Sequence, residues 1–187
     1  GFAHSIFLTN TGLLYSLGKN SFGQLGDGST TDRNSSYQVS SGVIDISAGY
    51  HHNLYVKNDS SLWGIGKNHK GQLGDGSIID RNSSVQILTG AIEVATGDNH
   101  SFYETTYIRM FSMGRNFSGQ LGLGTTSDTS TPTEFKASDL NQAFTGAFED
   151  QEYSGILANP VRDSNVSFSK TSGPYQSGDS NTIEYVQ

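Results

Sequence analysis

Short runs in which apolar and polar residues alternate recur along the first 144 residues, and this pattern predicts β-strands. In one run Ile44 and Ile46 share a face, and Ile92 and Val94 repeat the arrangement. No stretch has the periodicity of a helix. Within one unit of the pattern, strands are predicted at residues 42–48, 52–56, 61–66 and 85–88.

The pattern repeats every 48 residues, which divides residues 1–144 into the units 1–48, 49–96 and 97–144. Each unit opens with Gly-x-x-His, which places histidines at His4, His52 and His100. Each unit also contains a glycine-rich tetrad, namely Gly23-Gln24-Leu25-Gly26, Gly71-Gln72-Leu73-Gly74 and Gly119-Gln120-Leu121-Gly122. Four short antiparallel strands per unit are typical of a propeller blade. We therefore predict an all-β fold, a partial β-propeller of about three four-stranded blades.

The repeated residues have structural roles in this interpretation. The tetrad glycines are expected to adopt positive φ or to allow close approach of another segment. The three tetrad glutamines are expected to satisfy backbone groups within their loops. Hairpin turns are predicted at residues 10–12 and 58–60.

Two sets of residues have side chains that can bind metal ions. The three histidines would lie about one blade apart, too far to share an ion with bonds of about 2.1 Å, so each is expected to hydrogen-bond within its own blade. The segments 27–32 and 75–80 offer the oxygens that calcium prefers, but they lack the spacing of an EF-hand loop. We predict turns stabilised by aspartate there, with Asp32-Arg33 forming a turn cap and a solvated cation. No metal or cofactor is predicted.

Composition narrows the possible functions. The formal net charge is −7 with no basic run, which disfavours nucleic acid as a partner. The absence of cysteine excludes disulfides and thiol chemistry, and no apolar run reaches the roughly 20 residues of a membrane helix. No Gly-x-Ser-x-Gly or His-Glu-x-x-His motif is present, so an enzyme is not predicted. The composition favours a bacterial extracellular or cell-surface protein, with a cytoplasmic one as the alternative.

The second unit contains three motifs that recur in the other two, namely Gly49-x-x-His52, Leu62-Trp63-Gly64-Ile65-Gly66-x-Asn68 and Gly71-Gln72-Leu73-Gly74-x-Gly76. These motifs resemble those of the regulator of chromosome condensation repeat family. The resemblance implies blades of a seven-bladed β-propeller. Because three blades cannot close such a ring, the others are expected to lie outside this sequence, unless the chain forms an open arc. The first residues, Gly-Phe-Ala-His, favour an excerpt of a longer protein.

Residues 145–187 depart from the pattern because no further tetrad follows. They are interpreted as a degenerate fourth blade or a linker, partly disordered.

The repeats differ in ways that bear on function. Inside the Gly-x-x-His frame the variable pairs are Phe2-Ala3, Tyr50-His51 and Asp98-Asn99. A constant frame with variable tips is how repeat scaffolds present a binding surface, although exposed tips can also vary without constraint. The leading hypothesis is a non-enzymatic module that binds another protein through these rim loops. The family resemblance implies guanine-nucleotide exchange on a small GTPase as an alternative, and inhibition of an enzyme by a secreted protein as a third.

Overall fold

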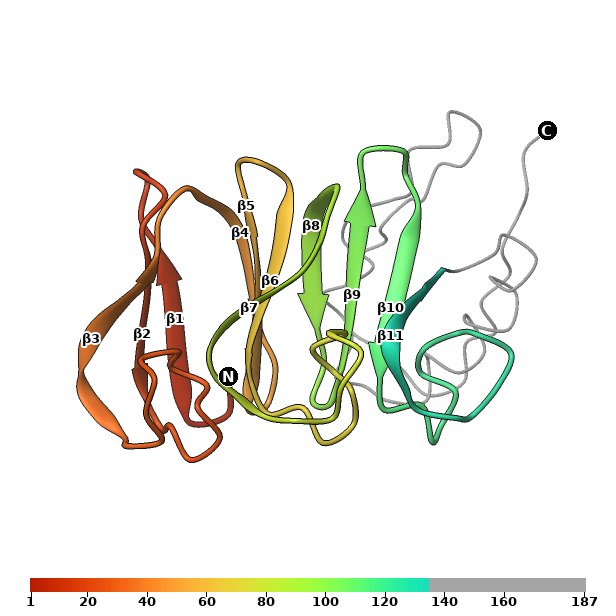
Figure 1. Cartoon of the computed structure of the whole chain (residues 1–187), viewed down its shortest axis with the longest axis horizontal. Helices are drawn as coiled ribbons and strands as arrows, with labels where there is room; N and C mark the ends of the chain where they lie inside the picture. The colour runs from red at the N-terminus through yellow and green to blue at the C-terminus, as the bar shows by residue number, and fades with distance from the viewer. Residues whose placement is uncertain (135–187) are drawn as a thin grey trace, which may run out of the picture. The chain divides into compact units, whose positions relative to one another are not determined.

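The computed structural model describes residues 1–134, which form β-strands joined by turns and loops (Figure 1). None of these residues belongs to a helix that could cross a membrane. The strands are β1 (His4–Leu8), β2 (Leu14–Gly18), β3 (Arg33–Ser40), β4 (Val43–Ala48), β5 (His52–Lys57), β6 (Ser61–Gly66), β7 (Arg81–Thr89), β8 (Ala91–Thr96), β9 (His100–Thr105), β10 (Met110–Gly114) and β11 (Thr129–Glu134).

The strands form three antiparallel sheets in the orders β1-β2-β3, β4-β5-β6-β7 and β8-β9-β10-β11. The prediction of an all-β fold with blade-like sheets is confirmed. Each four-stranded sheet takes its first strand from the end of the preceding 48-residue unit, since β4 ends unit 1–48 but pairs with β5. The prediction for residues 145–187 lies outside the described residues.

The predicted face of the first strand in each four-stranded sheet is wrong in one respect. Val43 lies opposite Lys57 and Asp45 lies opposite Val56, which leaves Ile44 as an extra residue in a β-bulge. The bulge breaks the alternation, so Ile44 is 52% exposed whereas Ile46 packs in the core. The same register shift exposes Ile92 while Val94 stays buried.

The hydrophobic core lies between neighbouring sheets. Leu54 and Leu62 of the second sheet pack with Tyr103 and Met113 of the third. The opposite face of the second sheet presents Tyr55 to a cluster that includes residues of the first sheet. The middle strand β5 is therefore buried on both faces, and each sheet depends on its neighbour to cover its apolar surface.

Two ends of the sheets carry different connections. The loop rim, lowest in Figure 1, comprises residues 1–3, the connections 49–51 and 97–99, and the long loops 19–32, 67–80 and 115–128. The hairpin rim at the other end comprises the turns 9–13, 58–60 and 106–109. The two hairpin turns predicted from sequence are confirmed. The strand predicted at 85–88 is longer than expected and begins at Arg81, directly after the loop.

Candidate functional site

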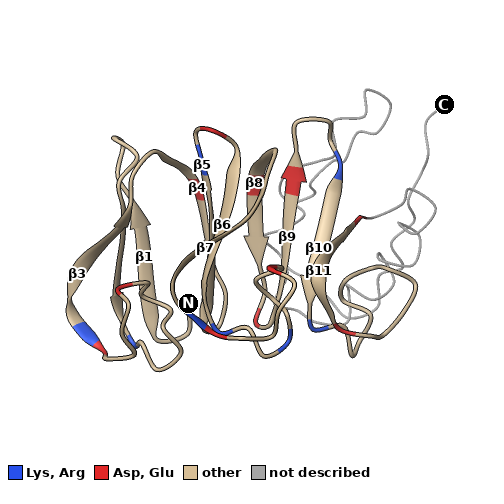
Figure 2. Cartoon of the chain, in the orientation of Figure 1, with Lys and Arg blue, Asp and Glu red and all other residues tan. Residues whose placement is uncertain are grey.

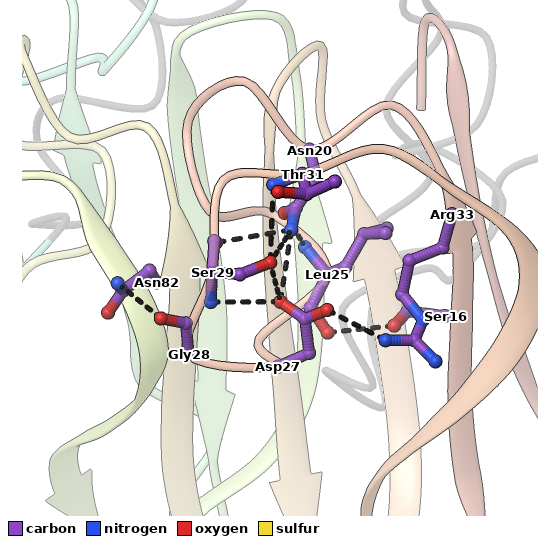
Figure 3. Close-up of polar contacts among 9 residues, drawn as sticks. All are labelled: Ser16, Asn20, Leu25, Asp27, Gly28, Ser29, Thr31, Arg33 and Asn82. Carbon is purple, nitrogen blue, oxygen red and sulfur yellow. Dashed lines mark hydrogen bonds and ion pairs between the residues drawn. The ribbon is translucent and has the colours of Figure 1, made fainter.

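Each long loop is organised by a buried asparagine that precedes the tetrad. Asn20 Nδ2 donates to Asp27 Oδ1 at 3.0 Å, and its Oδ1 accepts from the backbone N–H of Leu25 at 2.9 Å (Figure 3). The backbone N–H of Asn20 donates to Asp32 Oδ1 at 2.8 Å, which confirms Asp32 as a cap. Asn68 makes the same set of contacts in the second loop. The repeated Asn therefore holds the loop closed.

The tetrad glutamines have the predicted role. The side-chain oxygens of Gln24, Gln72 and Gln120 each accept a backbone N–H from two residues earlier at 2.9 Å. Gln24 and Gln72 are fully buried, so their side-chain oxygens would be costly to leave without these N–H partners. This prediction is confirmed.

Aspartates stabilise the turns that follow the tetrads, as predicted. Asp27 Oδ1 accepts from the backbone N–H of Ser29 at 3.0 Å and from its hydroxyl at 2.8 Å (Figure 3). Burial alone would raise the pKa of Asp27, but hydrogen bonds from Ser29, Arg33 and Asn20 together lower it. The prediction that Arg33 is a solvated cation is wrong, because the loop folds back and places its Nη1 3.1 Å from Asp27 Oδ2.

The tetrad glycines allow each loop to pack on the next sheet. Gly23 has φ of +76°, and a Cβ added there would lie 2.4 Å from the Cα of Asn82 in β7. The amide of Asn82 donates to the carbonyl of Gly28 at 2.9 Å, which closes the same junction (Figure 3). Both predicted reasons for glycine, positive φ and close approach, are confirmed.

Two of the three buried histidines, His4 and His52, join neighbouring sheets, so the prediction of bonds within one blade is wrong for these two. His4 Nε2 lies 2.7 Å from Asn53 Oδ1, and His52 Nε2 lies 2.8 Å from the hydroxyl of Ser101. The amide of Asn53 donates to the carbonyl of Gln24 at 2.7 Å, so its Oδ1 is left to accept from the imidazole. The hydroxyl of Ser101 likewise donates to the carbonyl of Gln72 at 2.7 Å, which leaves its oxygen to accept from His52. Both imidazoles therefore carry their proton on Nε2. The partners come from the next sheet because the sheets pack face to face.

Burial keeps these two imidazoles neutral. Desolvation lowers the pKa of His4 to about 4 and that of His52 to about 3. A Cβ added at Gly49 would lie 2.2 Å from the ring of His52, which explains the Gly-x-x-His spacing. Within residues 1–134, no three His, Cys, Asp or Glu side chains are grouped to hold a metal.

The structure brings three of the predicted rim residues together. The rings of Phe2 and Tyr50 stack with centroids 4.3 Å apart, and the His51 ring meets Tyr50 edge-on at 4.5 Å. Asp98 is joined to Tyr50 only through the backbone, since its carbonyl accepts the N–H of Tyr50 at 3.3 Å. Ala3 adds no ring to this group.

The same variable pairs also anchor the long loops through their backbones. The carbonyls of Ala3, His51 and Asn99 accept the backbone N–H groups of Lys19, Lys67 and Arg115 at 2.8, 2.9 and 2.8 Å respectively. Ala3 and Asn99 thus have a structural role whatever their side chains contact.

Sequence reasoning missed two aromatic members of the group. Phe22 lies 4.8 Å from His51 between ring centroids, and His69 lies 6.0 Å from Phe22. A signal for them was present, because the two positions between the repeated Asn and the tetrad also vary. Those pairs are Ser21-Phe22, His69-Lys70 and Phe117-Ser118. We call Phe2, Tyr50, His51, Phe22 and His69 the aromatic patch.

Further apolar side chains are exposed on the loop rim. Phe2 is 67% exposed and Phe117 is 74% exposed. Ile78 and Ile79 are also exposed, at positions where the first unit has Thr30 and Thr31. Acidic and basic residues are interspersed along the segments of this rim (Figure 2).

Known proteins share these repeats and this architecture. Models described as "Regulator of chromosome condensation (RCC1) repeat" match residues 11–56, 59–103 and 109–147, and a second model with that description matches 43–72. No curated protein sequence matches the chain.

Three solved structures resemble the described fold. Human WBSCR16 has 23% identity and a TM-score of 0.63, covering 72% of this chain and 37% of that one. Prp20p of Saccharomyces cerevisiae has 24% identity and a TM-score of 0.65, covering 72% and 36%. Yeast RCC1 (Prp20) bound by Kap60 has 18% identity and a TM-score of 0.63, covering 72% and 34%. Identities this low show the fold alone, and the chain spans little more than a third of these structures.

Proposed function

The chain belongs to the regulator of chromosome condensation repeat family, and on that premise we propose that it is a non-enzymatic module that binds another protein through its loop rim. The observation that carries the proposal is the convergence of variable positions. Phe2, Tyr50 and His51 vary within one constant frame and Phe22 within another, yet all four meet at the loop rim. The constant residues, by contrast, have structural roles in closing the loops and joining the sheets.

The exposed side chains at this rim suit a protein interface. Aromatic side chains are enriched at the centres of such interfaces, where they supply large contact areas. Phe2 stacks on Tyr50 yet remains two-thirds exposed, so it is ordered without being covered. Such a ring loses little conformational freedom when a partner covers it.

Similar structures also favour a binding role. The Prp20p structure is described with its binding properties to Gsp1p and histones, and another structure shows yeast RCC1 with Kap60 bound. These relatives do not name a partner for this chain.

Photo-crosslinking tests the proposal. The crosslinking amino acid p-benzoylphenylalanine would replace Phe2 on the loop rim or, as a matched control, Tyr107, which is exposed on the hairpin rim. We expect discrete protein adducts in an extract of the source organism from position 2 and not from position 107. The adducts should weaken when Tyr50 is also replaced by Ala. Equal adducts from both positions, or none from position 2, would contradict the proposal.

A further inference from the structure

The basic side chains of the loop rim fall into two groups. Arg33, Arg81 and Lys70 each pair with an aspartate, at 3.1, 2.6 and 3.2 Å respectively. These cations therefore have carboxylate partners within a loop or at a junction between loops. Because each of these cations already has a carboxylate partner, it is less available to a carboxylate of another protein.

The second group consists of Lys19, Lys67 and Arg115, which form no ion pair with any carboxylate in residues 1–134. They occupy the same position in each unit, between a constant Gly and the constant Asn. The hydrogen bonds of their backbone N–H groups to the short connections fix where each side chain starts. The rim therefore displays a regularly placed set of available cations on a chain whose formal net charge is −7.

Two of these cations lie at the aromatic patch. Lys67 Nζ lies 4.9 Å from the ring centroid of Phe22, whose ring contacts His51. Lys19 lies next to the patch through its backbone, because its N–H donates to the carbonyl of Ala3, the residue that follows Phe2, at 2.8 Å. In agreement with this placement, burial and then the charges of Lys67 and Lys19 lower the pKa of His51. The patch therefore combines an exposed apolar ring, Phe2, with a local positive field.

Resting on the proposed function, we infer that the aromatic patch with Lys19 and Lys67 recognises an acidic protein segment in which Asp or Glu flanks an aromatic or large aliphatic side chain. The apolar side chain packs against Phe2 and Tyr50, and the carboxylates meet the two ammonium groups. Complementary charge at an interface steers association and selects between partners.

Nucleic acid fits this surface less well, although it also combines negative charge with rings. Asp32 and Asp98 are exposed on the same rim, and they would repel a continuous phosphate backbone. A short peptide segment can place one or two carboxylates next to the lysines without bringing negative charge close to these aspartates. The observations therefore favour a protein segment.

Selection from a random peptide library displayed on phage tests the inference. The whole chain is the immobilised target, and enriched peptides are then synthesised and titrated against four proteins by fluorescence anisotropy. The proteins are the unaltered chain, the Lys67→Glu and Phe2→Ala variants and a Lys57→Glu control. Lys57 is a close match to Lys67 because its Nζ lies 5.1 Å from the ring centroid of Trp63, away from the patch. Circular dichroism verifies that all three variants fold.

We expect enriched peptides rich in Asp and Glu around an aromatic or large aliphatic residue. Lys67→Glu should weaken their binding about tenfold, since it replaces an attraction with a repulsion, whereas Lys57→Glu should not. Raising the salt concentration should weaken binding to the unaltered chain.

Other outcomes separate this inference from the proposed function. Neutral or basic peptides that lose affinity in a Phe2→Ala variant would overturn the inferred chemistry and leave the binding rim intact. Peptides insensitive to both Phe2→Ala and Lys67→Glu would count against both. Failure to enrich any peptide, or tighter binding of a labelled oligothymidine than of the peptides, would overturn the inference. In either case, crosslinking at position 2 would still test the proposed function independently.

Discussion

Acidification from pH 7 to pH 5 should destabilise the fold through the buried imidazoles of His4 and His52. Burial lowers their pKa values from 6.5 to about 4 and about 3. Below pH 6.5 these two histidines are therefore protonated in the unfolded chain while they remain neutral in the folded chain. The stabilising contribution is complete above pH 6.5 and is lost progressively as the pH falls toward 4 for His4 and toward 3 for His52.

The size of this loss in unfolding free energy follows from the difference between pH 5 and the pKa of histidine in the unfolded chain. At 1.36 kcal/mol per pH unit, each histidine costs about 2 kcal/mol at pH 5, and the two together about 4 kcal/mol. This is a large part of the stability of an ordinary domain. Asp27 and Asp75 have lowered pKa values, so their contribution is lost only below pH 3.8 and falls outside this window.

Urea unfolding at pH 7 and pH 5 measures the effect on the unaltered chain and on a His52→Asn variant. The variant should be less stable at both pH values, because Ser101 loses its imidazole partner. Its loss of free energy between pH 7 and pH 5 should nevertheless be smaller by about 2 kcal/mol. Ser101→Ala is the control, since it removes the hydroxyl that His52 contacts but leaves the buried imidazole in place, so it should keep the pH dependence of the unaltered chain.

Burial raises the pKa of Asp45, which opposes the histidine effect, but it acts equally in all three proteins and cancels in the comparison. An unchanged pH dependence in His52→Asn would refute the assignment of this imidazole as a neutral bridge between sheets.

Three further predictions follow from the loops and from the proposed function. Gly71→Ala should lower thermal stability more than Gly76→Ala. Both residues have positive φ, which costs an alanine about 1 kcal/mol, but only at Gly71 would the added Cβ lie 2.4 Å from Ser130 Cα. Equal losses of stability would show that the close approach of Ser130 is unimportant. Asn68→Ala should lower the free energy of unfolding in urea by about 2–3 kcal/mol, because it leaves the buried N–H of Leu73 without a partner. Asn58→Ala, at an exposed position, should lower it by under about 1 kcal/mol. Similar losses in the two variants would contradict the role of Asn68 in closing the loop. The chain should not accelerate release of a fluorescent GDP from purified small GTPases, and acceleration would replace the binding-only proposal with the exchange activity that the family resemblance implies.

Features that depend on near neighbours were predictable from the residues. The carboxamide of Gln24 bonds an N–H two residues away, and Asp27 bonds Ser29 over the same separation. Such contacts recur in every unit that keeps the residues, so the repeat reveals them. The extra residue at Ile44 was not predictable, because strict alternation does not show where a register shift will be placed.

Contacts between sheets were the other failure. His4 and His52 find partners 49 residues away, and Phe22 meets His51 from a different loop. The candidate site therefore emerged only in part, since one variable pair in each unit was identified and the other was not.

The repeat itself specified the strands, the turns and the closed shape of each loop, because hydrogen bonds within a blade join residues close in sequence and every unit encodes them again. Which face of a strand a histidine presents to its neighbour, and which variable tips meet in the aromatic patch, depended on how one sheet packs on the next. That packing is set by apolar contacts such as those of Leu54 with Met113 and Tyr103, which are made between units. A surface assembled from different units exists only after the units have packed together.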